Sequence, residues 1–312
     1  MRRLLLFVSA VFVVALSAVV VSGASSAGSV QARWLIRDLG SLGGNSQANA
    51  MNEKGQIVGM SGIGVKSATG GEIAHAFLWQ KGRMIDLGTL SADFNVSYAS
   101  AINGRGQIIG TSEKVVPMGN TEGTERSRAF LWQKGKLTDL GGFGGKITRA
   151  SAINEEGQIV GYSASTASPY SQAVLWQNGT IADLGTPPGF SGSGASAINE
   201  RGQVVGSSST ASGEFHAVLW QDGAVTDLGA LPGATVSVAR DINDRGQVVG
   251  YSDTASGEIH AVLWQDGTIT DLGTLPGFSG SSASAINARG QVVGYSVTAS
   301  GEIHAVLWEV RK

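Results

Sequence analysis

Few residues of this chain have the type and spacing that catalysis or metal binding requires, and those that do recur at equivalent positions. The four histidines, His75, His216, His260 and His304, all precede the same Ala-Phe or Ala-Val pair. A metal ion needs ligands within a few ångströms of one point, whereas equivalent positions of separate repeats lie apart. The absence of cysteine also excludes thiol catalysis and zinc–thiolate sites. We therefore expect no metal and no cofactor, and we expect these histidines to stabilise turns.

Polar residues that recur in every repeat are also poor candidates for a catalytic site. The Asp of Asp-Leu-Gly, the Asn of Ile-Asn or Met-Asn and the Gln that follows a glycine each occur six times. A catalytic centre needs unlike groups that converge at one place, and symmetric copies do not provide this. We therefore expect these residues to bond turn and strand backbone. Neither a Gly-x-Ser-x-Gly nucleophile elbow, nor a His-Glu-x-x-His zinc helix, nor an Asp-x-Asp-x-Asp-Gly calcium loop occurs.

Departures from the repeat are the better site candidates. The link between the Gln segment and the Trp segment spans 23 and 25 positions in the first two repeats but 17 in the last three. Loops tolerate variation that strands do not, and they often carry binding residues. The second repeat has an insertion, EKVVPMGNTEGTERSR (113–128). This insertion and the neighbouring link supply our candidate ligand-binding residues: Phe94, Tyr98, Lys114, Glu122, Glu125, Arg126 and Arg128. An ordinary solvated loop would have the same composition.

A second departure places Arg240 and Asp241 in ARDIN (239–243), where the other repeats have Ala-Ser-Ala-Ile-Asn or close variants. Charges in a packed segment of small residues are costly unless they are paired or face water. These two residues complete the candidate set, either as a local ion pair or as groups that face a wet channel.

The elements that must position these residues come from six repeats, of which the later ones recur every 44 residues. Each repeat reads as four short strands. In the last full set, ASAIN (283–287) and QVVGYS (291–296) flank an Asn-x-x-Gly turn. In the repeat before it, HAVLWQ (260–265) and TITDLG (268–273) flank Asp266-Gly267, a strong hairpin signal.

This pattern predicts an all-β fold, a six-bladed β-propeller of four-stranded antiparallel blades. The small-residue strand should be innermost, and the Trp strand should lie further out, between blades. A β-solenoid is the alternative, although its coils are shorter and lack such hairpins. The last repeat stops after HAVLWEVRK, without an Asp-Leu-Gly strand, while WLIRDLG (34–40) precedes the first repeat. We expect residues 34–40 to complete the last blade and close the ring.

The first residues of the chain have the pattern of a secretion signal. Arg2 and Arg3 precede an apolar run and a small-residue stretch, which predicts a signal peptide within residues 1–32, its cleavage site left open, and one propeller domain over 33–312. An uncleaved anchor is the alternative. Without the leader, 20 basic residues face 24 acidic ones, a net charge of −4. Because the basic residues do not cluster, we expect no nucleic-acid partner and no membrane contact beyond the leader.

The elements Asp-Leu-Gly, Ala-Ile-Asn, Gly-Gln-Val-Val-Gly and His-Ala-Val-Leu-Trp, in fixed order over residues 34–312, resemble the HAF-repeat family of bacterial extracellular repeat proteins. The literal His-Ala-Phe occurs only at residues 75–77. The resemblance implies export and a repeat architecture, and it implies no activity for named residues.

From these observations we predict a secreted, extracellular, monomeric propeller that acts as a non-catalytic binding or scaffold module, with no catalytic residue, for a glycan or protein at the cell surface. The alternative is an extracellular polysaccharide hydrolase or lyase that uses the loop face over the central channel. A surface-coat filler without a ligand is a third possibility. Convergence of unlike charged groups in one place would favour the enzyme.

Overall fold

The computed structural model describes residues 36–118 and 121–310. The predicted leader, residues 1–32, lies outside this range. The chain divides into two units, Met1–Asp38 and Leu39–Lys312, and all strands belong to the second unit. No helix among the described residues is long and apolar enough to cross a membrane.

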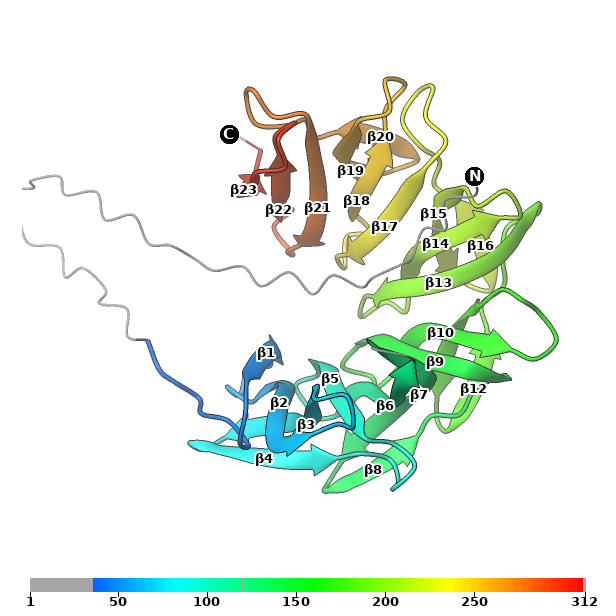
Figure 1. The fold of residues 1–312 in the computed structure, drawn as a ribbon. Helices are drawn as coiled ribbons and strands as arrows, with labels where there is room; N and C mark the ends of the chain where they lie inside the picture. Colours follow the sequence, from blue (N-terminus) through cyan, green and yellow to red (C-terminus); the bar gives the residue numbers. More distant parts are fainter. Residues whose placement is uncertain (1–35, 119–120, 311–312) are drawn as a thin grey trace, which may run out of the picture. The chain divides into compact units, whose positions relative to one another are not determined.

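The strands follow the repeats of the sequence (Figure 1). Repeats one to three form these twelve: β1 (Ser46–Met51), β2 (Ile57–Lys66), β3 (Glu72–Gln80), β4 (Arg83–Gly88), β5 (Val96–Ile102), β6 (Ile108–Met118), β7 (Thr121–Gln133), β8 (Lys136–Asp139), β9 (Gly144–Ile153), β10 (Ile159–Ser165), β11 (Gln172–Gln177) and β12 (Thr180–Asp183). Repeats four to six form these eleven: β13 (Phe190–Ile198), β14 (Val204–Thr210), β15 (Phe215–Gln221), β16 (Ala224–Asp227), β17 (Ser237–Ile242), β18 (Val248–Asp253), β19 (Ile259–Gln265), β20 (Thr268–Asp271), β21 (Gly280–Ile286), β22 (Val292–Val297) and β23 (Ile303–Trp308).

Each repeat folds as an antiparallel meander in which consecutive strands pair. The strand orders β1-β2-β3-β4, β13-β14-β15-β16 and β17-β18-β19-β20 are four-stranded sheets, as the sequence predicts. Repeats two and three are joined into one eight-stranded sheet by a parallel contact of β7 with β9, at Ser127 and Ile147. The expectation of antiparallel blades is therefore wrong at this point, where Ser127, six residues after the start of β7, lies beside Ile147 near the start of β9.

The predicted turns are confirmed. Asp266 and Gly267 both have positive φ, +51° and +74°, which is the backbone of a two-residue type I′ hairpin. The Asn-x-x-Gly turns have a glycine with positive φ, such as Gly290 at +85°, whose N–H donates to the Asn287 carbonyl at 3.0 Å. The turn residues thus fix the register of the strands on either side.

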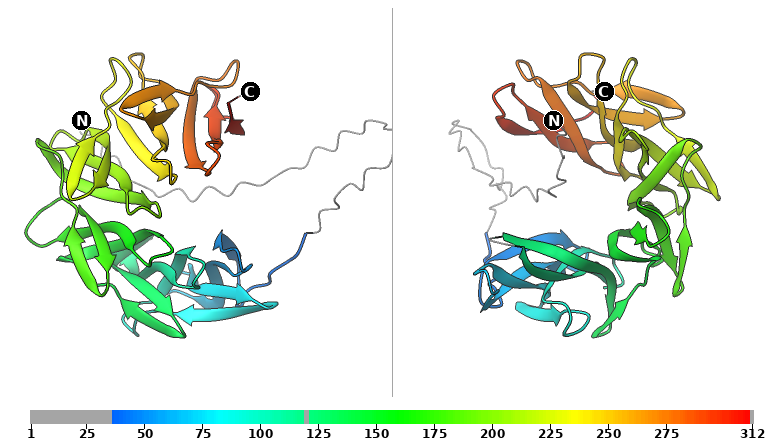
Figure 2. Two further views of the ribbon diagram at one scale, coloured as in Figure 1. Left: turned by 180° about the vertical axis from the view of Figure 1, so that it is seen from behind. Right: turned by 45° about the vertical axis from the view of Figure 1, so that its right-hand side comes forward.

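Consecutive sheets of the second unit follow one another in space as they do along the chain (Figure 2). They pack through small residues on one side and tryptophan on the other. Ala239 of β17 is fully buried, and Trp264 of β19 is 3% exposed in the same cluster. Val205 of β14 belongs to this cluster as well, so that the core lies between consecutive sheets rather than within one. This agrees with the prediction that the Trp strand fills the space between blades.

The repeated asparagine connects each sheet to the next. The Asn199 amide donates to the Gln203 side chain at 2.8 Å and to the Asn243 carbonyl of the following sheet at 3.0 Å. Its own oxygen accepts from the Arg201 and Gln203 backbone N–H groups. The same inter-sheet bond starts at Asn52, Asn103, Asn154 and Asn243. The prediction that these residues bond turn backbone is confirmed.

The structure does not show the closed six-bladed ring. The last sheet has three strands, β21-β22-β23, and residues 36–40 form no strand. Trp34 and Leu35 lie outside the described residues. The closing role assigned to residues 34–40 is therefore not shown, because residues 36–40, the described part of this segment, belong to no strand. What is established is an all-β chain of antiparallel sheets.

Candidate functional site

The inserted hairpin of β6 and β7 carries most of the predicted candidates, each in its own local contact. Lys114 Nζ lies 3.1 Å from Glu125 Oε1 in a partly exposed pair. Glu122 accepts hydrogen bonds from the Ser67 and Thr69 hydroxyls in the loop between β2 and β3, and these bonds lower the pKa of its carboxyl. These exposed pairs hold the loops against one another.

Arg128 and Phe94 also have structural contacts. The Arg128 guanidinium donates to the Gly145 carbonyl at 2.9 Å and to the Ser127 carbonyl at 3.2 Å. Phe94 is 9% exposed, in the turn before β5, with the Arg126 guanidinium 5.0 Å from its ring centroid. Arg126 also lies 3.8 Å from Asp93. Its Nε is buried, without a hydrogen-bond partner in the described structure.

Unlike groups converge at Tyr98, which does belong to the predicted set. Glu113 Oε1 accepts from the Arg149 guanidinium at 2.6 Å and from the Tyr98 hydroxyl at 3.3 Å. The other oxygen of Glu113 accepts from the Thr124 hydroxyl at 3.2 Å. The Arg149 guanidinium also lies 6.0 Å from the Tyr98 ring centroid, at the edge of cation–π range. We name Tyr98, Glu113 and Arg149 the carboxylate triad.

Two inner strands and one second strand position the triad. Tyr98 of β5 and Arg149 of β9 occupy the same place in their repeats, five residues before the turn asparagine. Glu113 lies in β6, next to the strand of Tyr98. The triad thus joins the sheets of repeats two and three.

Burial gives the triad unusual electrostatics. Glu113 is 8% exposed, so that its carboxylate has little water and depends on its three donors. Burial and then the negative charge of Glu113 raise the pKa of Tyr98 to about 12. Burial also raises the pKa of Tyr162, which pairs with Arg149 across β9 and β10. The Nε of Arg149 is buried and has no hydrogen-bond partner among the described residues.

Arg240 and Asp241 do not form the predicted ion pair. The Arg240 guanidinium lies 5.4 Å from the ring centroid of Tyr251 instead. Asp241 accepts from its neighbour Ile242 N at 2.9 Å and from Ile286 N of the next sheet at 2.8 Å. Burial raises the pKa of this carboxyl, and the two N–H bonds oppose the shift. No described contact connects Arg240 or Asp241 with the triad.

The histidines pair with the Asp of Asp-Leu-Gly in the fourth strand. His75 lies 3.0 Å from Asp86, and the equivalent pairs His216–Asp227 and His260–Asp271 are at 2.8 Å. His304 contacts Glu302 at 3.1 Å. Each histidine thus braces its own sheet. The described part of the chain holds no cluster of three or more His, Cys, Asp or Glu side chains that could bind a metal ion.

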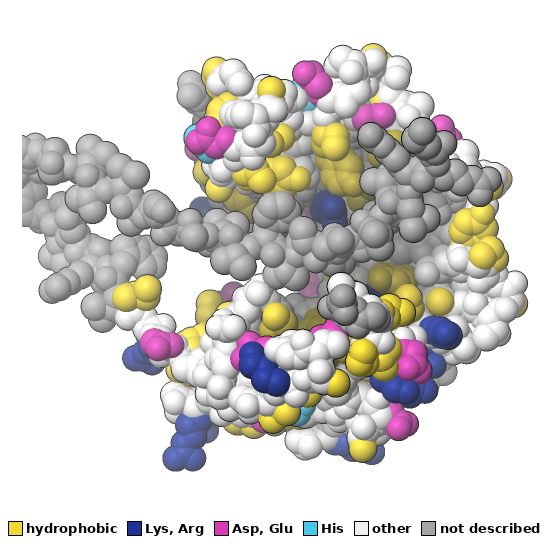
Figure 3. Space-filling model, viewed as in Figure 1, with side chains coloured by type: hydrophobic (Ala, Val, Ile, Leu, Met, Phe, Trp, Pro, Cys, Tyr) yellow, Lys and Arg dark blue, Asp and Glu magenta, His cyan; other side chains and the backbone are white. Residues whose placement is uncertain are grey.

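The sequence interpretation missed Glu113 and Arg149. The signal was present, because the position five residues before the turn asparagine varies as Gln, Tyr, Arg, Gly, Val and Ser while the next position is always Ala. Glu113 replaces small residues, valine or Asp253 in the other repeats. On the surface in Figure 3, acidic, basic and hydrophobic side chains are interspersed, without a large patch of one sign.

Sequence comparisons give no relative. No family model matches the chain, and no curated protein matches it.

Solved structures give the fold. Puromycin hydrolase matches with a TM-score of 0.51 at 13% identity, over 80% of this chain and 43% of that chain. Its S511A mutant in complex with PGG matches with a TM-score of 0.50, at the same identity and coverage. The β-propeller domain of the Trilobed protease from Pyrococcus furiosus, at 12% identity and a TM-score of 0.39, covers 85% of this chain and 96% of that chain. The fold of this all-β chain is therefore similar to part of puromycin hydrolase, and the chain spans less than half the length of the puromycin hydrolase chains.

The comparisons correct the functional prediction. Puromycin hydrolase is an enzyme by name, and its two structures match this fold with TM-scores of 0.50 and 0.51. The prediction of a non-catalytic binding or scaffold module is therefore wrong, and the enzyme alternative has the better support. Because an identity of 13% shows the fold alone, the reaction has to be argued from the site.

Proposed function

We propose that this protein is a hydrolase of extracellular polysaccharides whose reactive centre is the carboxylate triad. The observation that carries this proposal is the buried Glu113 carboxylate, bonded to both the Tyr98 hydroxyl and the Arg149 guanidinium. A buried carboxylate with a hydrogen-bonded phenol and an adjacent guanidinium is suited to proton transfer.

In this reaction Tyr98 relays a proton. Water adds to the anomeric carbon of the sugar while its proton moves to the Tyr98 oxygen, and the Tyr98 proton moves to Glu113. The bond from the anomeric carbon to the leaving oxygen breaks, and that oxygen takes a proton from solvent. Glu113 then releases the proton that it received to solvent, which restores the triad. Because the pKa of Tyr98 is about 12, the phenol carries its proton at neutral pH at the start of each cycle.

The triad differs from the usual pair of carboxylates in glycoside hydrolases, which flank the scissile bond. Glu113 is the carboxylate among the triad's contacts, and its other partners are a hydroxyl, a phenol and a guanidinium. The guanidinium groups of Arg126 and Arg149, whose side chains are 35% and 30% exposed, favour a substrate that carries its own carboxylates. We therefore propose acidic polysaccharides as the substrate class.

The test is release of reducing ends from polygalacturonate, alginate and hyaluronan by the full chain, with product masses. We expect products that have gained water, and a loss of roughly 10²–10⁴-fold in kcat for Glu113→Gln and Tyr98→Phe, the usual size of an acid–base contribution. Lys114→Gln is the matched control, because Lys114 belongs to an exposed pair nearby. Absence of cleavage, or full activity of Glu113→Gln, would overturn the proposal, and unsaturated products would replace hydrolysis by elimination.

The remaining features of the protein are proposed with this function. We propose that the chain is an exported, monomeric member of the HAF-repeat family, because the leader-like residues 1–32 and the repeated motifs favour export. We also propose that its six repeats are the six blades of a closed ring. The support is that every repeat forms a meander and that consecutive sheets share one hydrophobic cluster.

A further inference from the structure

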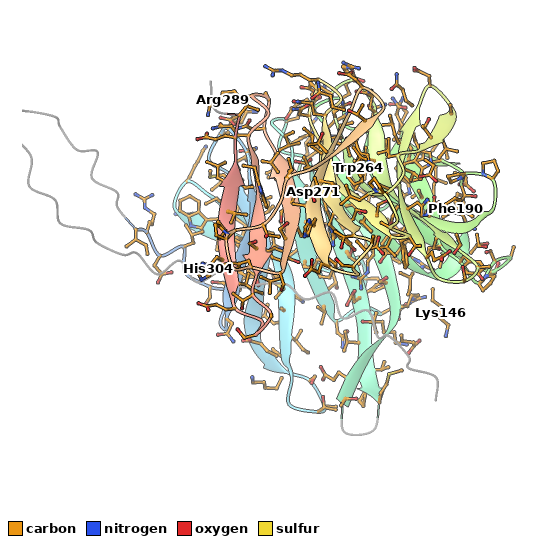
Figure 4. The ribbon with its side chains drawn as sticks, turned by 90° about the horizontal axis from the view of Figure 1, so that it is seen from above. Lys146, Phe190, Trp264, Asp271, Arg289 and His304 are labelled. Atoms are coloured by element: carbon orange, nitrogen blue, oxygen red, sulfur yellow. The ribbon has the colours of Figure 1, made fainter. Side chains whose placement is uncertain are left out.

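The inserted hairpin of β6 and β7 contains an irregularity next to the carboxylate triad. These strands have 11 and 13 residues, whereas β18 and β19 of the fifth repeat have 6 and 7. Figure 4 shows the hairpin extending beyond the ends of most other strands. Along it, Lys114 of β6 pairs with Arg126 of β7. The next residue, Val115, pairs with Thr124, so that Glu125 is an extra residue in β7 and forms a β-bulge.

The bulge decides which side chain of β7 lies beside the Glu113 carboxylate. Side chains alternate between the two faces of a sheet, so that Val115 lies on the same face as Glu113. In an uninterrupted ladder, Glu125 would pair with Val115 and bring a second carboxylate to that face. With the bulge, Thr124 takes this position, and the Glu125 carboxylate lies 3.1 Å from Lys114 Nζ. A hydroxyl donor thus replaces a like charge beside a buried carboxylate.

The Thr124 hydroxyl gives the two oxygens of Glu113 different partners. It donates to Glu113 Oε2 at 3.2 Å. The other oxygen, Oε1, accepts from the Tyr98 hydroxyl and from the Arg149 guanidinium. The terminal torsion of a glutamate side chain has no sharp preference, so that hydrogen bonds have to set it. A donor on Oε2 therefore fixes which oxygen faces the phenol.

Asn95 holds β6 at the bulge. It lies directly before β5, and its side-chain amide donates to the Val115 carbonyl at 2.9 Å. The side-chain oxygen of Asn95 accepts from the Val115 N–H at 2.8 Å. These two bonds fix the backbone of the residue that pairs with Thr124. The position of Thr124 beside Glu113 therefore depends on Asn95.

The fifth repeat shows how the equivalent acid is used without these contacts. Asp253 occupies the position of Glu113, ten residues after the turn asparagine, and Thr235 is the equivalent of Asn95. The Asp253 carboxylate accepts from the Thr235 and Val236 backbone N–H groups at 3.0 and 2.8 Å. In the second repeat, the Asn95 N–H donates to the backbone carbonyl of Glu113 instead, at 3.1 Å. The Asp253 carboxylate thus bonds the backbone of its own sheet, whereas the Glu113 carboxylate belongs to the triad.

We infer that Thr124 and Asn95 are positioning residues of the carboxylate triad. The Thr124 hydroxyl orients the Glu113 carboxylate toward the other two members of the triad. Asn95 fixes the strand that brings Thr124 to this place. The inference rests on the proposed function, and it assigns a role in that function to the insertion of the second repeat.

Fluorine NMR of the full chain with fluorotyrosine in place of tyrosine tests the inference without substrate. The chain has five tyrosines, and the signal of Tyr98 is the one that Tyr98→Phe removes. Thr124→Val keeps the shape of the side chain but removes the donor, so that we expect the Tyr98 signal to shift. Thr124→Ser should restore the native signal. Thr121→Val is the matched control on the same strand, because the Thr121 hydroxyl donates to the Met118 carbonyl at 3.0 Å.

Asn95→Ala tests the second positioning residue. We expect it to shift the Tyr98 signal in the same direction as Thr124→Val. The double variant should show no larger shift than Thr124→Val, because both residues act through one hydroxyl. A sum of the two shifts would remove Asn95 from the proposed role. Thr124 is exposed, so that its variants should keep the fold even if Asn95→Ala does not.

The inference is overturned if Thr124→Val leaves the Tyr98 signal in place or if Thr124→Ser does not restore it. An equal shift in Thr121→Val would also overturn it, since any change in the hairpin would then move the signal.

Kinetics with polysaccharide give the second readout. We expect Thr124→Val to lower kcat by roughly 10–100-fold at unchanged KM, the effect of displacing a reactive group, and Thr124→Ser to recover most of it. If the chain cleaves polysaccharide and Thr124→Val has the native kcat and the native Tyr98 signal, the inference is wrong and the proposed function stands. If no polysaccharide is cleaved and the Tyr98 signal still follows Thr124, the proposed function is wrong and the positioning of Glu113 stands.

Discussion

At the scale of single residues, the carboxylate triad is costly for folding, and this cost distinguishes it from the other charged pairs. The Lys114–Glu125 pair is partly exposed and contributes little. Glu113 is 8% exposed, and loss of one of its donors would leave a buried charge without compensation. A protein keeps such a group where the fold or its function needs it, which makes the triad the first place to look for activity.

The pKa of Tyr98 predicts how stability depends on pH. Its folded-state pKa is about 12, above the value near 10 for an unfolded tyrosine, so that the folded state holds this proton longer. The contribution is present below about pH 10 and is lost as pH rises through about 12. Urea unfolding should show a steeper loss of stability between these values for the native chain than for Tyr98→Phe. Tyr170→Phe is the control, and an equal slope for Tyr98→Phe and the native chain would contradict the prediction.

At the scale of the elements, the repeated asparagine is the main polar connection between sheets. The Asn199 side chain is 4% exposed and uses both its donor and its acceptor, within its turn and toward the next sheet. Because its partners would be left buried, Asn199→Ala should lower the free energy of unfolding by about 2–4 kcal/mol. Chemical denaturation measures this. Lys136→Ala, in a short strand and exposed, should change it by less than about 0.5 kcal/mol. A similar small change for Asn199→Ala would show that water replaces the inter-sheet bond.

The sequence predicts the elements because their determinants are local. Asn-x-x-Gly and Asp-Gly specify turns through backbone conformations that few other residues adopt, and the strands follow from the positions between the turns. Tyr98 could be selected as a departure from the repeat. Glu113 and Arg149 could not be connected to it, because Glu113 lies on the neighbouring strand and Arg149 comes from the following repeat, and sequence spacing does not reveal which variable side chains meet. The same reason explains why the predicted Arg240–Asp241 ion pair does not form. Arg240 contacts Tyr251 on the neighbouring strand, and Asp241 accepts from Ile286 N of the next sheet.

At the scale of the whole molecule, stability is distributed over the contacts between consecutive sheets, as in other repeat proteins. The last sheet is the place where this predicts a measurable difference. In the described structure Val249 is fully buried and Val293 is 47% exposed. Val249→Ala should cost about 2 kcal/mol of unfolding free energy, from lost methyl burial and the cavity left behind. If the proposed ring closes and Val293 is thereby covered, Val293→Ala should cost nearly as much unfolding free energy as Val249→Ala.

Thermal and chemical denaturation of Val249→Ala and Val293→Ala therefore test whether the ring closes. A cost for Val293→Ala near zero, with the full cost for Val249→Ala, would mean that the last sheet stays uncovered in solution. Deletion of residues 34–40 gives the matching test. If the ring closes in the full chain, Val293→Ala should cost unfolding free energy there and should cost almost none in the chain without residues 34–40.

The near identity of the last repeats has a consequence for folding. Residues 291–296 and 304–308 repeat residues 247–252 and 260–264 without change. A strand of one repeat would thus form the same hydrogen bonds with the second strand of another repeat. Local contacts alone therefore do not favour the native strand partner over the equivalent strand of the next repeat. The residues that make each repeat distinct, Tyr98, Glu113, Arg149 and Asp241 among them, are also those whose side chains reach across to another sheet. The few positions that differ between repeats would then specify which strands pair during folding. Replacing them by the residue of the other repeats should increase the fraction of misfolded chains, even where the replacement removes a buried charge.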